Sequence, residues 1–230
     1  MAFQAHTFAV GGRGKAEAPA VVRAGAASVP LSKRLFDKVF AAAALLFFAP
    51  FILIVAAAIL ITDGRPVFFV HRRVGLHGRS FPCLKFRTMA RDADARLQAL
   101  LCENPVARAE WEATRKLTRD PRIHCLGAFL RKTSLDELPQ FWNVLRGEMS
   151  VVGPRPVVGE EAAFYKGHFA DYISVRPGIT GAWQVSGRSN TTYDERVQMD
   201  VDYIRNRSFW GDVRIVLKTV RAILLRDGAV

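Results

Sequence analysis

The sequence predicts a mainly α-helical protein with a small β element, in which a re-entrant membrane helix precedes a cytosolic domain. Three observations predict this class. Every residue from Val39 to Ile61 is apolar, and Pro50 lies near the middle of that run. Basic residues flank the run on both sides. Downstream, apolar residues at helical spacing are more common than the short alternating stretches typical of strands.

The composition limits the classes of function. The chain has 230 residues, and 33 Lys and Arg residues against 21 Asp and Glu residues give a net charge of +12. Such a charge predicts anionic partners: nucleic acid, phosphorylated substrates or an anionic membrane surface. Because 50% of the residues are hydrophobic, a disordered basic tail protein is excluded. The three cysteines form no CxxC pair, which argues against a zinc site or a disulfide framework and fits a reducing compartment.

Residues 1–31 are expected to form a mobile N-terminal tail. This stretch is rich in Ala, Gly and Val, and its apolar residues follow no period. It contains neither the compact apolar run nor the cleavage site of a secretory signal peptide. The tail therefore contributes nothing to the predicted fold.

Residues 32–63 are expected to be embedded in the membrane, and two arrangements compete. A helix of this length can cross a hydrocarbon core of about 30 Å. Pro50, however, removes a helix hydrogen bond in the middle of the run. Positive charges favour the cytoplasmic side, and they occur before and after the run: Lys33, Arg34, Lys38, Arg65, Arg72 and Arg73. A helix-break-helix that turns near Pro50 and returns satisfies both clusters, whereas a kinked spanning helix is the alternative.

Residues 64–230 are expected to form the cytosolic domain. After the turn residues Asp63 to Pro66, two short strands are predicted around a polar loop. Helices are expected over Ala90–Leu117 with a break at Asn104-Pro105, and over Leu126–Leu130, Leu138–Leu145 and Phe209–Leu225; loops are expected at Gly153–Pro156 and Pro177–Gly181. Amphipathic segments at Phe164–Tyr172 and Phe209–Leu225 are candidates to lie in the membrane interface, with ordinary core packing as the alternative.

The densest candidate for chemistry is the stretch from Leu130 to Pro156, LRKTSLDELPQFWNVLRGEMSVVGPRP. It contains the adjacent carboxylates Asp136 and Glu137. Their structural interpretation is helix capping, because Ser134-x-x-Glu137 fits a capping box and Asp136 suits a first helical turn. Their functional interpretation is phosphate chemistry, in which one carboxylate attacks phosphorus and the other holds Mg²⁺.

Cationic side chains surround these carboxylates in the sequence. In Lys85-Phe86-Arg87 the two cations fall on one side of a strand, since side chains alternate. Arg155 lies between two prolines, and Arg176 precedes a Pro-Gly turn. Each alone would be a solvated surface residue, but their combination predicts an anion site. The sequence contains no P-loop, HExxH or GxSxG motif, which excludes the common enzyme classes that depend on them.

Three blocks of the sequence resemble the signatures of a known family. KFRTM (Lys85 to Met89), the stretch Leu130 to Pro156, and RPGITGAWQVSGR (Arg176 to Arg188) are similar to those of bacterial sugar transferases, the monotopic polyprenyl-phosphate hexose-1-phosphate transferases. The resemblance runs from about Ser32 to the C-terminus. The chain length is similar to that of the short members that initiate exopolysaccharide synthesis, some of them specific for galactose or glucose.

The resemblance implies a reaction and a location. A UDP-sugar would lose UMP, and its sugar 1-phosphate would pass to undecaprenyl phosphate through a covalent aspartyl-phosphosugar intermediate. Asp136 would be the nucleophile, and Glu137 would support Mg²⁺. The residues that would bind substrate are Lys85, Arg87, Arg131, Arg155, Arg176, Gln184 and Arg188. The enzyme would sit in the bacterial inner membrane with its catalytic domain on the cytoplasmic face. A re-entrant helix broken at Pro50 is also implied, although Ala49 stands where the family often has Ser.

One further function stays open from the residues. A membrane-tethered basic adaptor that binds anionic lipid or nucleic acid without catalysis would account for the charge and the apolar run. It would not account for two adjacent carboxylates within a cationic block. For the enzyme we expect a UDP-sugar donor, an undecaprenyl phosphate acceptor and no nucleic acid, and a homodimer is compatible with it.

Overall fold

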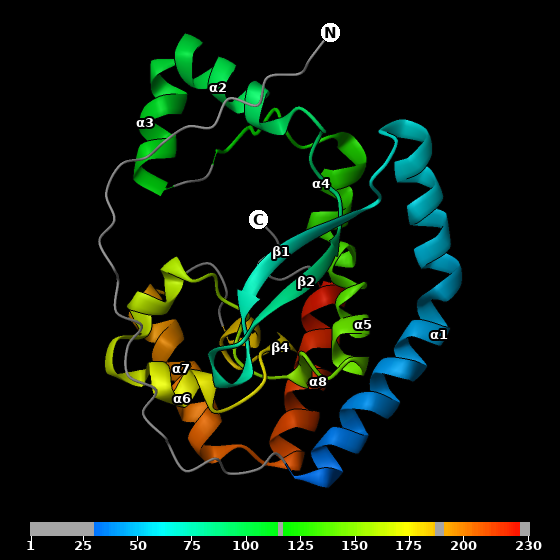
Figure 1. Cartoon of the computed structure of the whole chain (residues 1–230), viewed down its shortest axis with the longest axis vertical. Helices are drawn as coiled ribbons and strands as arrows, with labels where there is room; N and C mark the ends of the chain where they lie inside the picture. Colours follow the sequence, from blue (N-terminus) through cyan, green and yellow to red (C-terminus); the bar gives the residue numbers. More distant parts are fainter. Residues whose placement is uncertain (1–29, 115–116, 187–190, 226–230) are drawn as a thin grey trace, which may run out of the picture.

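Helices make up most of the fold and the β structure is small, as the sequence predicts. The computed structural model describes residues 30–114, 117–186 and 191–225 (Figure 1). Residues 1–29 of the expected N-terminal tail therefore lie outside the described residues. The elements are α1 (Leu31–Thr62), β1 (Phe68–Val74), β2 (Ser80–Phe86), α2 (Ala93–Glu103), α3 (Pro105–Thr114), α4 (Cys125–Lys132), α5 (Gln140–Leu145), β3 (Ser150–Val152), α6 (Phe169–Ile173), β4 (Gly178–Thr180), α7 (Tyr193–Asn206) and α8 (Phe209–Leu225). The predicted separation of α2 from α3 at Asn104-Pro105 is confirmed.

The apolar run forms one helix instead of the expected helix-break-helix. α1 continues through Pro50, and Figure 1 shows the ribbon changing direction about half-way along it. Proline removes one backbone donor and pushes away the preceding turn, so it bends a helix when the flanking hydrogen bonds survive. Both halves of α1 pack on the rest of the protein, because Ala41 and Ile59 are both fully buried.

The two predicted strands pair as an antiparallel hairpin. β1 and β2 align Phe68 with Phe86 and Phe69 with Lys85. The connection needs Gly78, whose φ of +74° lies in the left-handed region that favours glycine. Alternation along β2 puts Phe81, Cys83 and Lys85 on one face and Phe86 on the other; Phe81, Cys83 and Phe86 are all buried. Lys85 is only partly buried and lines the candidate site.

A second sheet was not expected. β3 and β4 pair in parallel, so the segment Pro177–Gly181, expected as a loop, contains a strand. The two backbones approach so closely that a Cβ on Gly178 would lie 2.1 Å from the amide nitrogen of Gly153. Glycine at both positions therefore permits the pairing. This sheet holds the Gly153–Pro156 loop, and with it Arg155, beside the candidate site.

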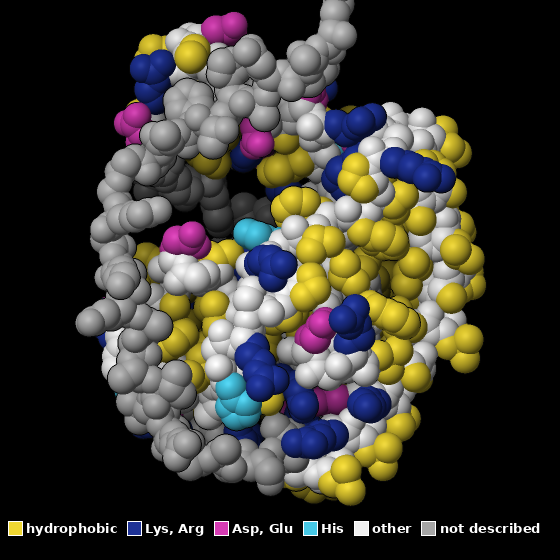
Figure 2. Space-filling model, viewed as in Figure 1, with side chains coloured by type: hydrophobic (Ala, Val, Ile, Leu, Met, Phe, Trp, Pro, Cys, Tyr) yellow, Lys and Arg dark blue, Asp and Glu magenta, His cyan; other side chains and the backbone are white. Residues whose placement is uncertain are grey.

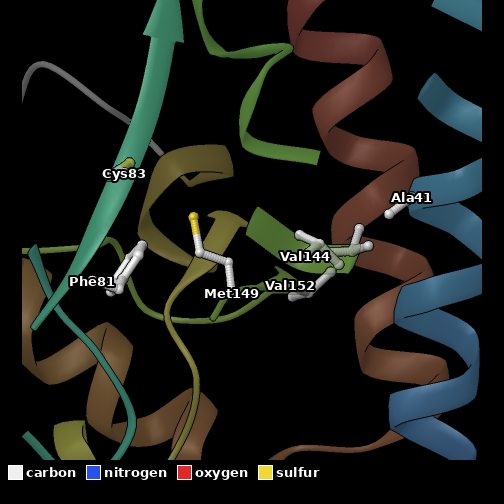
Figure 3. Close-up of a cluster of buried hydrophobic side chains, with 7 residues drawn as sticks. Ala41, Phe81, Cys83, Val144, Met149 and Val152 are labelled. Carbon is white, nitrogen blue, oxygen red and sulfur yellow. The ribbon is translucent and has the colours of Figure 1, made fainter. Parts of the chain in front are cut away.

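The main core joins α1 to β2, α5 and β3. Figure 3 shows Ala41 of α1 beside Val144 of α5 and Val152 of β3, with Phe81 and Met149 farther along the same cluster. A second cluster packs Val55 and Ile59 of α1 against Phe86, Leu130 and Leu138. α1 is thus a component of the fold along its whole length.

A third cluster lies under α7. It contains Tyr165 and Tyr172, which are 2% and 1% exposed. Within the segment Phe164–Tyr172, Tyr165 and Tyr172 therefore pack in the core, whereas Phe164 is 52% exposed. α7 begins with a capping box in which Thr192 and Glu195 satisfy each other's backbone amides, a signal present in the sequence.

Asp200 of α7 is a buried carboxyl in this cluster. It is 2% exposed, and the Tyr165 hydroxyl donates a hydrogen bond of 2.8 Å to its Oδ2. Burial raises the pKa of Asp200 to about 7, although the Tyr165 hydroxyl and the Arg155 backbone amide partly oppose this increase. A carboxyl that binds its proton more tightly in the folded state stabilises the protein as pH falls through the folded pKa.

We therefore expect the thermal stability of the wild type to gain from Asp200 as pH falls from 8 to 6. Asp200→Asn should lose that gain, because the amide does not titrate and resembles the protonated carboxyl. Thermal unfolding at several pH values measures the difference between the two proteins. Asp202→Asn, on the exposed side of α7, is the matched control. A wild type and an Asp200→Asn variant with parallel pH profiles would contradict this assignment.

Candidate active site

The two adjacent carboxylates lie on a 3-10 turn, Leu135–Glu137, between α4 and α5. Ser134 precedes them with a φ of +56°, a left-handed conformation that is costly for a residue with a side chain. The Ser134 side chain makes no capping hydrogen bond. The capping-box interpretation is therefore wrong, and Asp136 and Glu137 are presented by a strained turn.

Lys85 of β2 connects the two carboxylates. Its Nζ donates to Oε1 of Glu137 at 2.5 Å and lies 4.0 Å from Oδ2 of Asp136. Asn143 of α5 fixes this arrangement, since its side chain accepts from the Leu84 amide at 3.0 Å and donates to the Pro82 carbonyl at 2.7 Å. The strand that carries Lys85 is thereby held against the helix that follows the carboxylates.

Asp136 is the more buried of the pair, with 8% of its surface exposed. Burial raises the pKa of its carboxyl to about 6; the Lys85 ammonium opposes the increase and the Glu137 carboxylate adds to it. Asp136 is consequently mostly ionised at neutral pH, yet poorly hydrated. A desolvated carboxylate is a better nucleophile than one in water.

Arg87 links the site to the end of α1. Its Nη2 lies 2.7 Å from the Asp63 carboxylate and donates to the Gly64 carbonyl at 2.8 Å. Its Nε and Nη1 are buried and have no hydrogen-bond partner among the described residues. Arg87 thus fixes the C-terminal end of α1, and two of its N–H groups have no acceptor among the described residues.

Other cations complete the surroundings. Arg131 of α4 donates from Nε to the Thr88 hydroxyl at 2.8 Å, and Asp136 contributes to the electrostatic environment of its guanidinium. The guanidinium groups of Arg155 and Arg196 lie 5.9 and 4.8 Å from the centre of the Trp183 ring, within the range of cation–π attraction.

These groups open into one cavity of about 1550 Å³. The predicted site residues that line it are Lys85, Arg87, Arg131, Asp136, Glu137, Arg155 and Gln184. On the face shown in Figure 2, basic side chains lie around acidic ones beside the hydrophobic surface of α1. The structure therefore brings together most of the side chains that the sequence selects.

Two predicted residues are not part of this group. Arg176 lies outside the cavity lining, and its Nε donates to the Gly147 carbonyl at 2.7 Å. The charges that act on it are those of Arg34 and Asp37, near the start of α1. Arg188 lies outside the described residues.

Sequence analysis also missed several lining residues, chiefly Arg73, Arg122, Trp183 and Arg196. Arg122 directly follows Pro121 and Arg73 lies two residues before Gly75, so the same kind of Gly or Pro signal that selected Arg155 and Arg176 was present at both. Trp183 lies next to Gln184 within the third block, so the signal that selected Gln184 could also have selected Trp183. Arg196 lies in α7, which the sequence analysis did not predict.

The arrangement suits phosphate chemistry. Arginines and a lysine can neutralise phosphate oxygens around a poised carboxylate. No group of three or more His, Cys, Asp or Glu side chains that could hold a metal exists among the described residues. The two carboxylates fit Mg²⁺ nonetheless, because this ion is commonly held by one or two carboxylates together with substrate phosphates.

Comparison with known proteins agrees with this chemistry. The family model for the bacterial sugar transferase matches residues 28–226. The exopolysaccharide production protein ExoY of Rhizobium meliloti (strain 1021) is 50% identical over 199 residues, which cover 86% of this chain and 88% of that protein. The undecaprenyl-phosphate galactose phosphotransferase of Salmonella typhimurium is 47% identical over 197 residues, 86% of this chain but 41% of that longer protein.

A further relative carries a different sugar in its name. The UDP-glucose:undecaprenyl-phosphate glucose-1-phosphate transferase of Xanthomonas campestris pv. campestris is 40% identical over 204 residues, 84% of this chain and 39% of that protein. The resemblance found in the three sequence blocks is thus confirmed, and the family match extends over residues 28–226. The chain belongs to the bacterial sugar transferase family.

Proposed function

We propose that this enzyme transfers a sugar 1-phosphate, galactose or glucose, from a UDP-sugar to undecaprenyl phosphate and so initiates exopolysaccharide synthesis. The observation that carries the proposal is the buried Asp136 carboxyl beside Glu137 and Lys85 in a cation-lined cavity. The names of the relatives support the two substrates, since they include transfer of galactose and glucose phosphate to undecaprenyl phosphate.

The reaction proceeds in two displacements at one phosphorus. An oxygen of Asp136 attacks the β-phosphorus of the donor, the bond from that phosphorus to the bridging oxygen breaks, and UMP leaves with the bonding electron pair. The sugar phosphate is then an acyl phosphate on Asp136. A phosphate oxygen of undecaprenyl phosphate attacks the same phosphorus, the bond to Asp136 breaks, and the carboxylate is regenerated.

The cations hold both substrates in turn. Arg87, Arg131 and Arg155 line the cavity around Asp136 and are suited to the diphosphate of the donor. Once UMP has left, the same side chains are available to the acceptor phosphate. Lys85 keeps the two carboxylates together at distances of 2.5 and 4.0 Å and limits the pKa of Asp136, so the nucleophile is charged when the donor binds.

Mg²⁺ would be held by Glu137 with phosphate oxygens of the donor, and it would neutralise charge on the diphosphate. We expect Glu137→Gln to reduce UMP release by about 100-fold and to raise the Mg²⁺ concentration needed for half-maximal rate, since an amide is a weaker ligand. Titration of UMP release with Mg²⁺ tests this. Glu103→Gln, at an exposed position of α2 outside the cavity lining, is the control. A variant that changed only in thermal stability would leave Glu137 without a role in metal binding.

Contacts at both ends of α1 support a re-entrant position in the membrane. Asp37 accepts from the Ser150 hydroxyl at 2.8 Å, and Asp63 pairs with Arg87 at 2.7 Å. These two residues lie about 39 Å apart along a straight helix, which exceeds the hydrocarbon thickness of about 30 Å. Because both bind the same domain, a helix that crossed the bilayer would have to break one of these contacts.

The outer surface of α1 is suited to a shallow position in one leaflet. Its large exposed apolar residues are Leu31, Leu35, Val39, Leu46, Phe47, Leu53, Ile54, Leu60 and Ile61. α8 adds Trp210 and Leu217, which are 71% and 64% exposed, next to the exposed cations Arg214 and Lys218. Such a helix fits the interface with its cations toward anionic headgroups, and this position brings the cavity to the level of a lipid phosphate.

Both ends of α1 should accordingly face the cytoplasm. We expect cysteines placed at Ser32 and Arg65 to react with a permeant maleimide and to be protected from an impermeant one in intact cells. Both positions are exposed, and Arg65 avoids the Asp63 contact with Arg87. The background protein should have its three native cysteines replaced, since Cys102 and Cys125 are also exposed. Labelling of either position by the impermeant reagent would establish a spanning helix.

UMP release separates the proposal from the adaptor alternative. The purified protein in nanodiscs, with Mg²⁺ and a panel of UDP-sugars, should release UMP, and an adaptor would release none. Double-reciprocal plots at several acceptor concentrations should be parallel. Without acceptor, a burst of at most one UMP per active site should accompany label from a β-³²P donor on the protein. Intersecting plots without a burst would indicate direct transfer in a ternary complex.

A further inference from the structure

The cavity does not end at the cations. It continues to a stripe on α1 formed by Phe40, Ala43, Ala44 and Phe47. Their spacing of three, four and seven residues places them on one face of the helix. Phe40, at one end of this stripe, also packs against the core cluster that contains Ala41. Ala43 and Phe47 are exposed, so the rest of the stripe is a wall of the cavity outside the packed core.

α8 supplies the opposite wall. Val216 and Val220 line the same cavity, also one helical turn apart. Thr219 between them lies 2.7 Å, oxygen to oxygen, from Thr180 of β4, which fixes the position of α8 relative to the carboxylate site. Two helix faces with apolar side chains thus border one end of the cavity.

The shape of this end follows from its residues. Alanines at 43 and 44 leave depth that larger side chains would fill, while Phe40 and Phe47 bracket them one turn away on each side. Phe40 also contacts Phe141, with 6.2 Å between the ring centres, which closes the side nearest α5. The result is an apolar groove that leads from α1 and α8 to Asp136 and Lys85.

From these observations we propose that the groove between α1 and α8 binds the first isoprene units of the polyprenyl acceptor; this rests on the proposed function. A ligand that matches both ends of the cavity must join a phosphate to a long apolar chain. The cations at one end complement the phosphate, and the two helix faces at the other end exclude polar atoms. α1 and α8 carry the apolar surfaces placed in the leaflet, so the chain continues from the groove into lipid.

The length of the groove limits the contact. From Phe40 to Phe47 the helix rises about 10 Å. An undecaprenyl chain is far longer, so only its first units touch the protein. Apparent affinity for acceptors should therefore increase as isoprene units are added and reach a plateau once the groove is filled. The sugar and the nucleotide of the donor take no part in this dependence.

Filling the groove tests the assignment. Ala44→Trp should raise the KM for undecaprenyl phosphate by about tenfold or more, because a buried apolar contact of this size contributes that order of affinity. The UMP burst without acceptor should stay near the wild-type amplitude. Ala42→Trp is the matched control, since Ala42 is an exposed alanine of α1 that does not line the cavity. On α8, Val220→Trp should raise the KM for undecaprenyl phosphate in the same way. Leu217→Trp, at an exposed position of α8 outside the cavity lining, is its matched control.

A second measurement does not depend on turnover. Undecaprenyl phosphate carrying a diazirine within its first isoprene units is irradiated with the wild-type protein in nanodiscs without donor. We expect label on peptides of α1 and α8 around positions 40–47 and 216–220, and competition by undecaprenyl phosphate but not by phosphatidylglycerol. Ala44→Trp should lose this label, and Ala42→Trp should keep it.

The outcomes separate the groove from the function. Label spread elsewhere, equal competition by phosphatidylglycerol, or an unchanged KM in a folded Ala44→Trp protein would overturn the groove while wild-type UMP release still supported the transferase. Absence of UMP release with every donor would overturn the proposed function. Competition by phosphatidylglycerol would assign the groove to a bilayer lipid.

Discussion

We expect Asp136→Asn to reduce turnover by about 1000-fold or more, since an amide oxygen is a poor nucleophile at phosphorus. The burst of UMP and the label trapped from a β-³²P donor should disappear with it. The substitution is nearly isosteric, so the turn and the Lys85 contact with Glu137 should persist. Single-turnover UMP release in nanodiscs measures the loss.

Folding can be checked independently in the same variant. Because burial raises the pKa of Asp136 to about 6, the ionised carboxylate destabilises the fold at higher pH. Asp136→Asn should consequently be at least as thermostable as the wild type at pH 8. Asp202→Asn, exposed on α7, controls for the loss of one charge. Residual turnover above a few per cent in Asp136→Asn would refute the assignment of Asp136 as the nucleophile. If the variant lost its turnover but the wild type trapped no label, Asp136 would instead be a base or a metal ligand.

Local patterns predicted the hairpin and several helices, although α7 was not predicted and α1 is not broken at Pro50. Apolar spacing located α8, and Asn104-Pro105 located the end of α2, because these signals depend on a few neighbouring residues. The pairing of β3 with β4 joins segments far apart in the chain, and each strand has only three residues. No local period exists over such a length, so tertiary contacts alone decide the pairing.

The arginines show a similar limit within the site. Arg155 and Arg176 both adjoin proline in stiff loops, and the sequence treats them alike. The structure turns Arg155 toward the cavity and Arg176 toward the Gly147 carbonyl. The two arginines lie at opposite ends of the parallel β3–β4 pair, because Arg155 follows β3 and Arg176 precedes β4. Pro50 is a comparable case, because proline fixes the loss of a hydrogen bond but not whether the helix bends or breaks there.

The second large effect is expected at the other end of the molecule, where a network of charges fastens α1 to the domain. Asp37 is 4% exposed; it accepts from the Ser150 hydroxyl at 2.8 Å and the Val151 amide at 3.1 Å, and it pairs with Lys33 at 3.0 Å. Lys33 also pairs with Asp212 of α8 at 2.8 Å. The network therefore joins α1, β3 and α8.

Asp37→Ala should destabilise the protein by about 3 kcal/mol, because it leaves the Ser150 hydroxyl, the Val151 amide and part of the Lys33 charge buried without their partner. Thermal unfolding in detergent measures this, with Asp202→Ala as the exposed control. Activity should fall as well, since α1 bears one wall of the cavity and must stay in register with β3. Asp37→Asn keeps one acceptor oxygen, so its unfolding temperature should lie between those of the wild type and Asp37→Ala. An unfolding temperature equal to that of the wild type would mean that apolar packing of Ala41 and Ile59 alone holds α1, and that the charge network only orients it.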